Sequence, residues 1–198
     1  YKNIHQKAIL DLCNKDNRIR QAIEKYGMPE DRKIDGGFET LFRMIVGQQI
    51  SVKAANSVWR KLEKINANNP ERLLKLTEKK LKNAGLSKQK INYSKDLASK
   101  TISRELNFDD LIKLSNKEVH SKLTSIKGIG DWTADIYQLF VLCDMDAFPY
   151  ADIAVQEGAK FHFNLENRPK PEELLKLVQE WTPLRGAGAL VMWQIYRK

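Results

Sequence analysis

The chain of 198 residues contains only two cysteines, Cys13 and Cys143. They lie far apart in the sequence, without CxxC spacing and without a neighbouring histidine cluster. Neither a disulfide framework nor a zinc site is therefore expected. Both thiols are expected to act as small hydrophobic groups of a core in a reducing compartment.

Long apolar runs are also absent, and none approaches the roughly 20 residues that a membrane-spanning helix needs. The segment that follows Tyr1 has no apolar stretch of the kind found in signal peptides, so we expect a protein that is not secreted. The missing initiator Met suggests that the chain is not the complete translated sequence.

Strand patterns are missing as well, because no period-two run is bounded by hairpin turns. Helical periodicity fills the sequence instead. Residues 38–46 place their apolar side chains on one helical face, and Ser51 is suited to cap the next helix. Ser115 and Glu118 form a capping box, and a last, largely buried helix is expected over 183–196. The sequence predicts an all-α fold.

The charge balance favours a polyanionic partner. Lys and Arg number 34 against 25 Asp and Glu, a net charge of +9, while apolar residues make up 42% of a chain that should be globular. Nucleic acid is a better fit to this surplus than an anionic membrane surface. Many soluble proteins are lysine-rich, however, so charge alone does not decide the partner.

A glycine turn lies within LTSIKGIGDWTADIYQLF, residues 123–140, where Gly128 and Gly130 separate two helical segments. A dinucleotide fingerprint is excluded, because no strand precedes the turn. The glycines could provide a tight connection only. They could also expose the amides of the following helix, next to Lys127, to a backbone phosphate.

Asp152 lies downstream in DAFPYADIAVQEG, residues 146–158, at the start of a helical run. An Asp in that position is a natural helix N-cap. The alternative is a carboxylate held at the mouth of a cleft, next to the turn, for chemistry. The local pattern leaves both readings open.

Taken in order, these segments resemble the helix–hairpin–helix and catalytic Asp of the HhH-GPD superfamily of DNA glycosylases. FRMIVGQQISVKAANSVW (42–59) is similar to the I-x-G-Q-Q-x-S segment of the AlkA-type 3-methyladenine DNA glycosylases II. AGLSKQKINY (84–93) resembles the turn before a long helix in that branch, and WTPLRGAGALVMWQIYR (181–197) its W-x-P-x-R-x-x-A helix. The similarity covers about residues 36–197.

The resemblance implies a fold of two packed helical subdomains with a cleft between them. It places amino-terminal helices over 1–35, packed on the bundle, a glycosylase core over 36–198 and the helix–hairpin–helix over about 115–142. Trp132 stands where bifunctional relatives carry the lysine that forms a Schiff base, so no lyase activity is expected. Two cysteines cannot build the four-Cys iron–sulfur loop of other branches, and no cofactor is expected.

The resemblance also assigns roles to individual residues. Asp152 would stabilise the positive charge that develops on the deoxyribose or orient the attacking water. Gln49 would fill the gap left by a flipped base, supported by Gln48 and Ser51, although relatives often have an apolar residue there. The turn would hold a backbone phosphate through Lys127, Gly128, Gly130 and Thr133. It would also hold a monovalent cation on the backbone carbonyls of Thr124, Ile126 and Ile129.

Trp132 and Arg185 keep two readings each, and Tyr150 has one. Trp132 could line a pocket for a cationic base, or belong to a core stripe with Ile136 and Leu139. Tyr150 could line the same pocket. Arg185 could contact DNA or form a structural ion pair. Trp59, Trp181 and Trp193 lie on apolar faces and are expected in the core, and His162 in the core or at its rim.

The function that the resemblance implies is that of a monofunctional glycosylase, which removes alkylated purines such as 3-methyladenine and 7-methylguanine from double-stranded DNA. A non-catalytic helix–hairpin–helix DNA-binding module and a glycosylase for deaminated or oxidised bases are the alternatives. We expect a monomer without a membrane partner, located in the cytoplasm at the nucleoid of a prokaryote or in the nucleus of a eukaryote.

Overall fold

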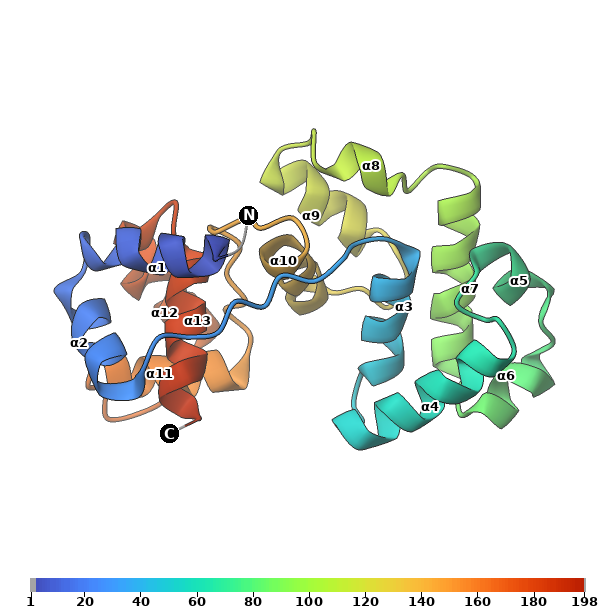
Figure 1. Cartoon of the computed structure of the whole chain (residues 1–198), viewed down its shortest axis with the longest axis horizontal. Helices are drawn as coiled ribbons and strands as arrows, with labels where there is room; N and C mark the ends of the chain where they lie inside the picture. The colour runs from blue at the N-terminus through green and yellow to red at the C-terminus, as the bar shows by residue number, and fades with distance from the viewer. Residues whose placement is uncertain (1–2, 198) are drawn as a thin grey trace. The chain divides into compact units, whose positions relative to one another are not determined.

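The computed structural model describes residues 3–197, and within this range it contains helices and turns but no strand. The prediction of an all-α fold is therefore confirmed. The chain forms two compact units, whose helices are labelled in Figure 1. Between residues 3 and 197, no helix combines the length and apolar character that crossing a bilayer requires.

The first unit joins the residues up to Ile34 with those from Asp135 onward. Its elements are α1 (Ile4–Cys13), α2 (Asn17–Tyr26), α11 (Ile153–His162), α12 (Pro171–Leu177), the 3₁₀ turn η1 (Gln179–Trp181) and α13 (Arg185–Tyr196).

The second unit is the continuous segment Asp35–Ala134. Its helices are α3 (Phe38–Gly47), α4 (Val52–Lys64), α5 (Pro70–Lys75), α6 (Glu78–Ala84), α7 (Lys88–Ile102), α8 (Phe108–Leu111) and α9 (Asn116–Thr124). Helix α10 (Asp131–Phe140) begins in this unit and ends in the first.

The amino-terminal helices share one hydrophobic core with the carboxyl-terminal helices. Ile9 and Leu12 of α1 and Ile19 of α2 are fully buried in the cluster that contains Val191 and Ile195 of α13 (Figure 1). Because such burial contributes about 1.5–3 kcal/mol for each large aliphatic side chain, α1 and α2 contribute substantially to the stability of this unit.

Close helix packing explains two glycines of the first unit. A Cβ atom on Gly158 would lie 2.0 Å from the carbonyl oxygen of Met192, so α11 and α13 approach each other closely at this point. A Cβ atom on Gly186 would lie 2.6 Å from the carbonyl oxygen of Ala147. Larger residues would separate these segments and open the core.

Most local predictions are confirmed. Ser51 Oγ accepts a hydrogen bond from the Ala54 amide (3.2 Å) at the start of α4. Ser115 and Glu118 form the predicted capping box of α9. The last helix begins at Arg185, two residues later than predicted from Pro183. The apolar face of α3 is buried as expected, through Phe38, Leu41, Phe42, Ile45 and Val46.

A buried polar cluster ties α2 to the carboxyl-terminal half of the first unit. The Asp16 carboxylate accepts hydrogen bonds from Arg18 Nε and Nη2 (3.0 and 2.8 Å) and from Trp181 Nε1 (3.0 Å). Burial alone would raise the pKa of Asp16, but these donors outweigh it and lower the pKa to about 2. His162 Nε2 lies 3.9 Å from this carboxylate, and the side chain is only 2% exposed.

Protonation of His162 is expected to destabilise the protein in mild acid. Burial lowers the pKa of His162 to about 4, although Asp16 acts in the opposite direction. The unfolded chain, with an ordinary pKa of about 6.5, then binds a proton more readily than the folded chain, so stability falls as pH drops from 6.5 to 4. The fall between pH 7 and pH 5 should be about 2 kcal/mol smaller in His162→Leu, measured by urea unfolding. The same pH dependence in both proteins would contradict this.

Candidate functional site

Two buried isoleucines hold the turn between α9 and α10 in place. Ile126 and Ile129 are 2% and 4% exposed, and the Ile129 amide donates to the Ile126 carbonyl (3.1 Å). The first intrahelical bond of α10 runs from the Ala134 amide to the Gly130 carbonyl (3.0 Å). This arrangement places the carbonyls of Thr124, Ile126 and Ile129, the expected cation ligands, within one short turn.

The two glycines of this turn have different structural roles. Gly128 has φ +83°, and a Cβ atom there would lie 2.1 Å from the Tyr93 ring, so both backbone conformation and packing require glycine. A Cβ atom on Gly130 would meet nothing within 4 Å. The open side of the turn therefore lies over Gly130, where the first amides of the ten-residue helix α10 begin. A helix N-terminus with an open approach is suited to an anion.

Lys127 and Thr133, the other two expected phosphate contacts, differ in exposure. The Lys127 side chain is 73% exposed, its ammonium lies 3.9 Å from Asp96 Oδ1, and its backbone amide donates to Asp96 Oδ2 (3.0 Å). Asp96 therefore holds the backbone of the turn while the charged end of Lys127 reaches solvent. Thr133 is buried (4% exposed), so its hydroxyl lies in the interior and only its backbone is placed near the helix end.

The segment between α3 and α4 is joined directly to the glycine turn. Gln48 Nε2 donates to the Gly128 carbonyl (2.7 Å), so Gln48 links the two segments as a support. Gln49, the expected wedge, is exposed. Its φ is +57°, a backbone conformation that residues other than glycine rarely adopt. Ser51 serves as the cap of α4. The apolar Ile50, not anticipated from the sequence, is 40% exposed beside Gln49.

Lys90 of α7 holds the same segment and was also not anticipated. Its Nζ donates to the carbonyls of Val46 and Gln48, both at 2.7 Å. Burial lowers the pKa of this ammonium, which is half-buried behind the segment. The helical pattern gave no signal for this role, because a lysine at that position is equally consistent with an exposed polar face.

Trp132 does not belong to the core. Its side chain is 43% exposed on the first turn of α10, so the reading that places Trp132 in the core stripe is wrong. Leu139 of that stripe is buried, and Ile136 packs against the core. The helix instead turns Thr133 and Tyr137 inward (4% and 1% exposed). An exposed indole beside the open side of the glycine turn is compatible with the pocket role.

Asp152 is the N-cap of α11 and has an additional partner from another helix. Its Oδ1 accepts hydrogen bonds from the Val155 amide (3.0 Å) and from Trp193 Nε1 of α13 (3.1 Å). Trp193 is half-buried, packs against the core of the first unit as expected, and stacks on Phe140 with the ring centroids 5.8 Å apart. Its indole N–H holds Asp152 from this position. The N-terminus of α11 is a favourable place for negative charge.

Tyr150 and Arg185 flank this segment in the first unit. Tyr150 is half-buried, and its carbonyl accepts a hydrogen bond from Gln156 Nε2 (2.8 Å), which shapes the approach to α11. Arg185 makes a two-pronged ion pair with Asp146 (2.8 and 2.6 Å). The hydrogen bonds to Asp146 raise the pKa of Arg185 despite its partial burial. This geometry favours the structural ion pair over the DNA contact for Arg185.

Trp59 and Trp181 are in the core as predicted, at 4% and 2% exposed, and the side chain of His162 is buried beside Trp181. The contacts around the two candidate sites therefore come from several segments: the second unit assembles Gln48, Lys90, Asp96, Lys127 and Gly128, and the first unit assembles Asp152 and Trp193.

Comparison with known proteins identifies the family. The model of the HhH-GPD superfamily base excision DNA repair proteins matches residues 42–184. DNA-3-methyladenine glycosylase 1 of Schizosaccharomyces pombe is 31% identical over 196 residues, which cover 95% of this chain and 86% of that protein. The alkylbase DNA glycosidase-like protein mag2 of the same organism is 27% identical, over 96% and 93%.

Solved structures agree with this match. The crystal structure of a DNA-3-methyladenine glycosidase from Bacillus halodurans superposes with a TM-score of 0.86 at 30% identity, over 93% of this chain and 87% of that one. The S. pombe 3-methyladenine DNA glycosylase Mag1, in complex with abasic DNA, gives a TM-score of 0.82 at 29% identity, over 94% and 95%. The chain is a member of the HhH-GPD superfamily of base excision DNA repair proteins.

Proposed function

We propose that this protein is a monofunctional DNA glycosylase that removes alkylated purines from double-stranded DNA in base excision repair. It acts as a monomer, at the nucleoid or in the nucleus depending on the organism. The observation that carries the proposal is Asp152, whose carboxylate is fixed by donors from two helices in a chain of this superfamily. The relatives above that are named for 3-methyladenine support the choice of lesion.

DNA is held through the second unit. The open side of the glycine turn over Gly130 and the exposed ammonium of Lys127 bind backbone phosphate, which positions the duplex without reading its sequence. The segment carrying Gln49 and Ile50 enters the base stack when the damaged nucleotide leaves it, and compensates part of an unstacking cost of a few kcal/mol. Trp132 offers an exposed indole face to the extruded cationic base.

The chemical step is hydrolysis of the N-glycosidic bond. The bond between C1′ and the base nitrogen breaks, and its electron pair leaves with the base, which neutralises the cationic alkylated purine. Positive charge develops on the deoxyribose, where the Asp152 carboxylate stabilises it. Water adds its oxygen to C1′ and releases a proton, so the products are a free base and an abasic site. Since the alkylated base leaves without protonation, one carboxylate is sufficient, unlike the pair used in glycoside hydrolysis.

The lysines near the turn are poorly suited to lyase chemistry. A Schiff base needs an amine that is free to attack C1′. Trp132 occupies the position of that amine in bifunctional relatives, and the Lys90 ammonium is committed to the carbonyls of Val46 and Gln48. Lys127 is exposed but lies near Asp96. The reaction therefore ends at the abasic site.

The proposal is tested with duplexes that contain 3-methyladenine or 7-methylguanine. We expect the free base to be released, measured by chromatography, and no covalent protein–DNA adduct to appear when borohydride is added. Binding without release would indicate a non-catalytic DNA-binding module. Release of only deaminated or oxidised bases would indicate a different lesion, and a borohydride adduct would contradict the monofunctional assignment.

Substitution of Lys90 should impair activity through the Gln48–Gln49 segment. In Lys90→Met the carbonyls of Val46 and Gln48 lose their shared donor, and the segment shifts relative to the glycine turn. We expect base release under single-turnover conditions to fall about tenfold, with a smaller change in DNA affinity, because misplacement affects the flipped state more than phosphate binding. Lys88→Met, at the exposed start of the same helix, is the matched control. Equal release by both variants would rule out this positioning role.

A further inference from the structure

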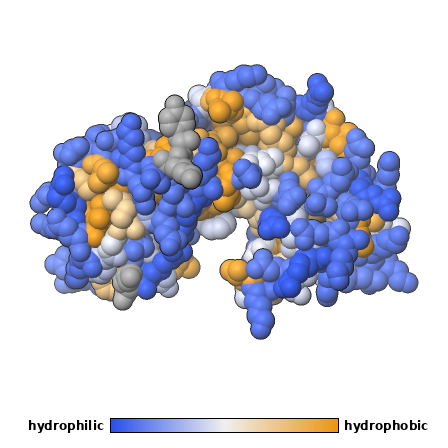
Figure 2. Space-filling model, viewed as in Figure 1, coloured by the Kyte–Doolittle hydropathy of each residue, from blue (hydrophilic) through white to orange (hydrophobic). Residues whose placement is uncertain are grey.

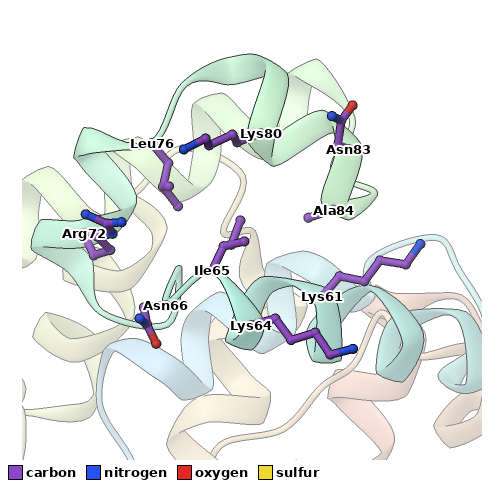
Figure 3. A pocket seen from close by; sticks show the side chains of 9 residues that line it. All are labelled: Lys61, Lys64, Ile65, Asn66, Arg72, Leu76, Lys80, Asn83 and Ala84. Atoms are coloured by element: carbon purple, nitrogen blue, oxygen red, sulfur yellow. The ribbon is translucent and has the colours of Figure 1, made fainter.

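A pocket on the second unit lies outside the residues assigned to DNA binding and catalysis. Its volume is about 540 Å³, within the range of about 300–1,000 Å³ typical of ligand pockets. It is formed by the end of α4, the following turn, and α5 and α6 (Figure 3). The residues that line it are Lys61, Lys64, Ile65, Asn66, Arg72, Leu76, Lys80, Asn83 and Ala84.

The rim of this pocket is strongly cationic. It includes Lys61, Lys64, Arg72 and Lys80, and no carboxylate lines it. Elsewhere on the unit cations have acidic partners; Lys82 Nζ, for example, lies 2.6 Å from Glu78 Oε1. Within residues 3–197, no ion pair involves any of the four rim cations. The surface over α4 to α6 is mostly hydrophilic on the face seen in Figure 2. An occupant with several negative charges would be complementary to this rim.

The floor of the pocket is aliphatic. Leu76 and Ala84 are each 5% exposed, and Ile65 is half-buried. In Figure 3 the side chain of Ile65 lies between the lysines of α4 and Lys80 of α6, and Leu76 lies beside Lys80. No aromatic residue is among the lining residues, so a nucleobase would find no ring to stack on. An aliphatic side chain fits this floor better.

The backbone around the pocket also argues against a single tightly held phosphate. Lys61, Lys64 and Ile65 lie at the carboxyl end of α4, and Asn83 and Ala84 at that of α6. The carbonyls at helix carboxyl ends carry partial negative charge, which repels an anion close to the backbone. The negative charges must therefore meet the flexible side chains at the rim, as separate carboxylates along a peptide would do.

We propose that this pocket binds an acidic segment of a partner protein. One or two aliphatic side chains of the segment contact Ile65 and Leu76, and flanking Asp and Glu residues pair with the cations of the rim. The site is distinct from the residues that act on DNA, so binding of the segment leaves base release in place and recruits the partner to the protein. The proposal does not depend on which lesion is removed.

The test uses a fluorescein-labelled peptide with a Leu-Leu pair flanked by Asp and Glu, and fluorescence anisotropy. We expect Lys64→Glu combined with Arg72→Glu to weaken binding at least about tenfold, because two attractive charge pairs become repulsive. Lys75→Glu combined with Lys79→Glu is the matched control. It introduces the same charge change on exposed positions of α5 and α6 outside the pocket, and should weaken binding about twofold or less. Thermal unfolding verifies that each variant is folded. If the Lys64→Glu, Arg72→Glu protein is unfolded, the double variant Lys64→Gln, Arg72→Gln is used in its place.

The apolar contact is tested separately. A peptide with both leucines replaced by serine should bind about tenfold more weakly, because the aliphatic floor is then left without a partner. Equal binding of the two peptides, or equal effects of the pocket and control variants, would overturn the proposal in favour of general charge attraction. Binding of a single-stranded oligonucleotide that depends on Lys64 and Arg72, without peptide binding, would identify the pocket as a nucleic-acid site and would also overturn it.

Discussion

Asp152→Asn should abolish release of methylated purines while DNA binding and the fold are retained. Asparagine caps helices as well as aspartate does, and its carbonyl oxygen can still accept from the Val155 amide and Trp193 Nε1. The substitution therefore removes the negative charge and little else. Because that charge is proposed to stabilise the cationic sugar in the transition state, we expect the single-turnover rate to fall by about 10²–10³-fold or more.

The control for this variant is Glu157→Gln, which removes the carboxylate of a half-buried residue on the same helix, where Glu157 pairs with Arg168 (3.3 Å). Its rate of base release should remain near that of the wild type. Wild-type release by Asp152→Asn would mean that Asp152 is a helix cap and nothing more, and the catalytic group would have to be sought elsewhere.

Gly128→Ala should destabilise the second unit and weaken DNA binding, whereas Gly130→Ala should affect binding alone. At Gly128 a methyl group meets the Tyr93 ring at 2.1 Å and the backbone has φ +83°. The positive φ costs about 1–2 kcal/mol and the steric overlap about 1–3 kcal/mol more, so we expect a loss of about 2–5 kcal/mol in the free energy of unfolding. The Tyr93 hydroxyl accepts a hydrogen bond from Gln89 Nε2 (2.5 Å), and displacement of the ring would break it.

Gly130 provides the comparison within the same turn. A Cβ atom there meets nothing within 4 Å. The free energy of unfolding of Gly130→Ala should therefore lie within about 1 kcal/mol of the wild-type value. If phosphate approaches on this open side, the methyl group should reduce DNA affinity severalfold. Urea unfolding and anisotropy with a labelled duplex measure the two effects. Unchanged affinity in Gly130→Ala would remove the open side of the turn from the DNA-binding surface.

The helices and their ends were predictable because their signals are local. The apolar face of α3, the cap at Ser51 and the capping box of Ser115 and Glu118 depend on residues within one or two turns of each other, and all three are found in the structure. Trp132 shows where this reasoning fails. An apolar stripe can be drawn through α10 on either of two faces, and only the helices that pack against it decide that Thr133 and Tyr137 are buried while Trp132 is exposed.

The order of motifs along the chain was sufficient to indicate the superfamily, an all-α fold and Asp152 as the candidate carboxylate. The partners of the candidate residues were not accessible in the same way. Gln48 with Gly128, Lys90 with Val46, and Asp152 with Trp193 are pairs separated by 80, 44 and 41 positions. Helix periodicity and capping arise from hydrogen bonds and contacts among near neighbours, so a sequence encodes them directly. Which distant donor reaches a carboxylate or a carbonyl depends on how the helices pack, and for that reason it was decided only by the tertiary structure.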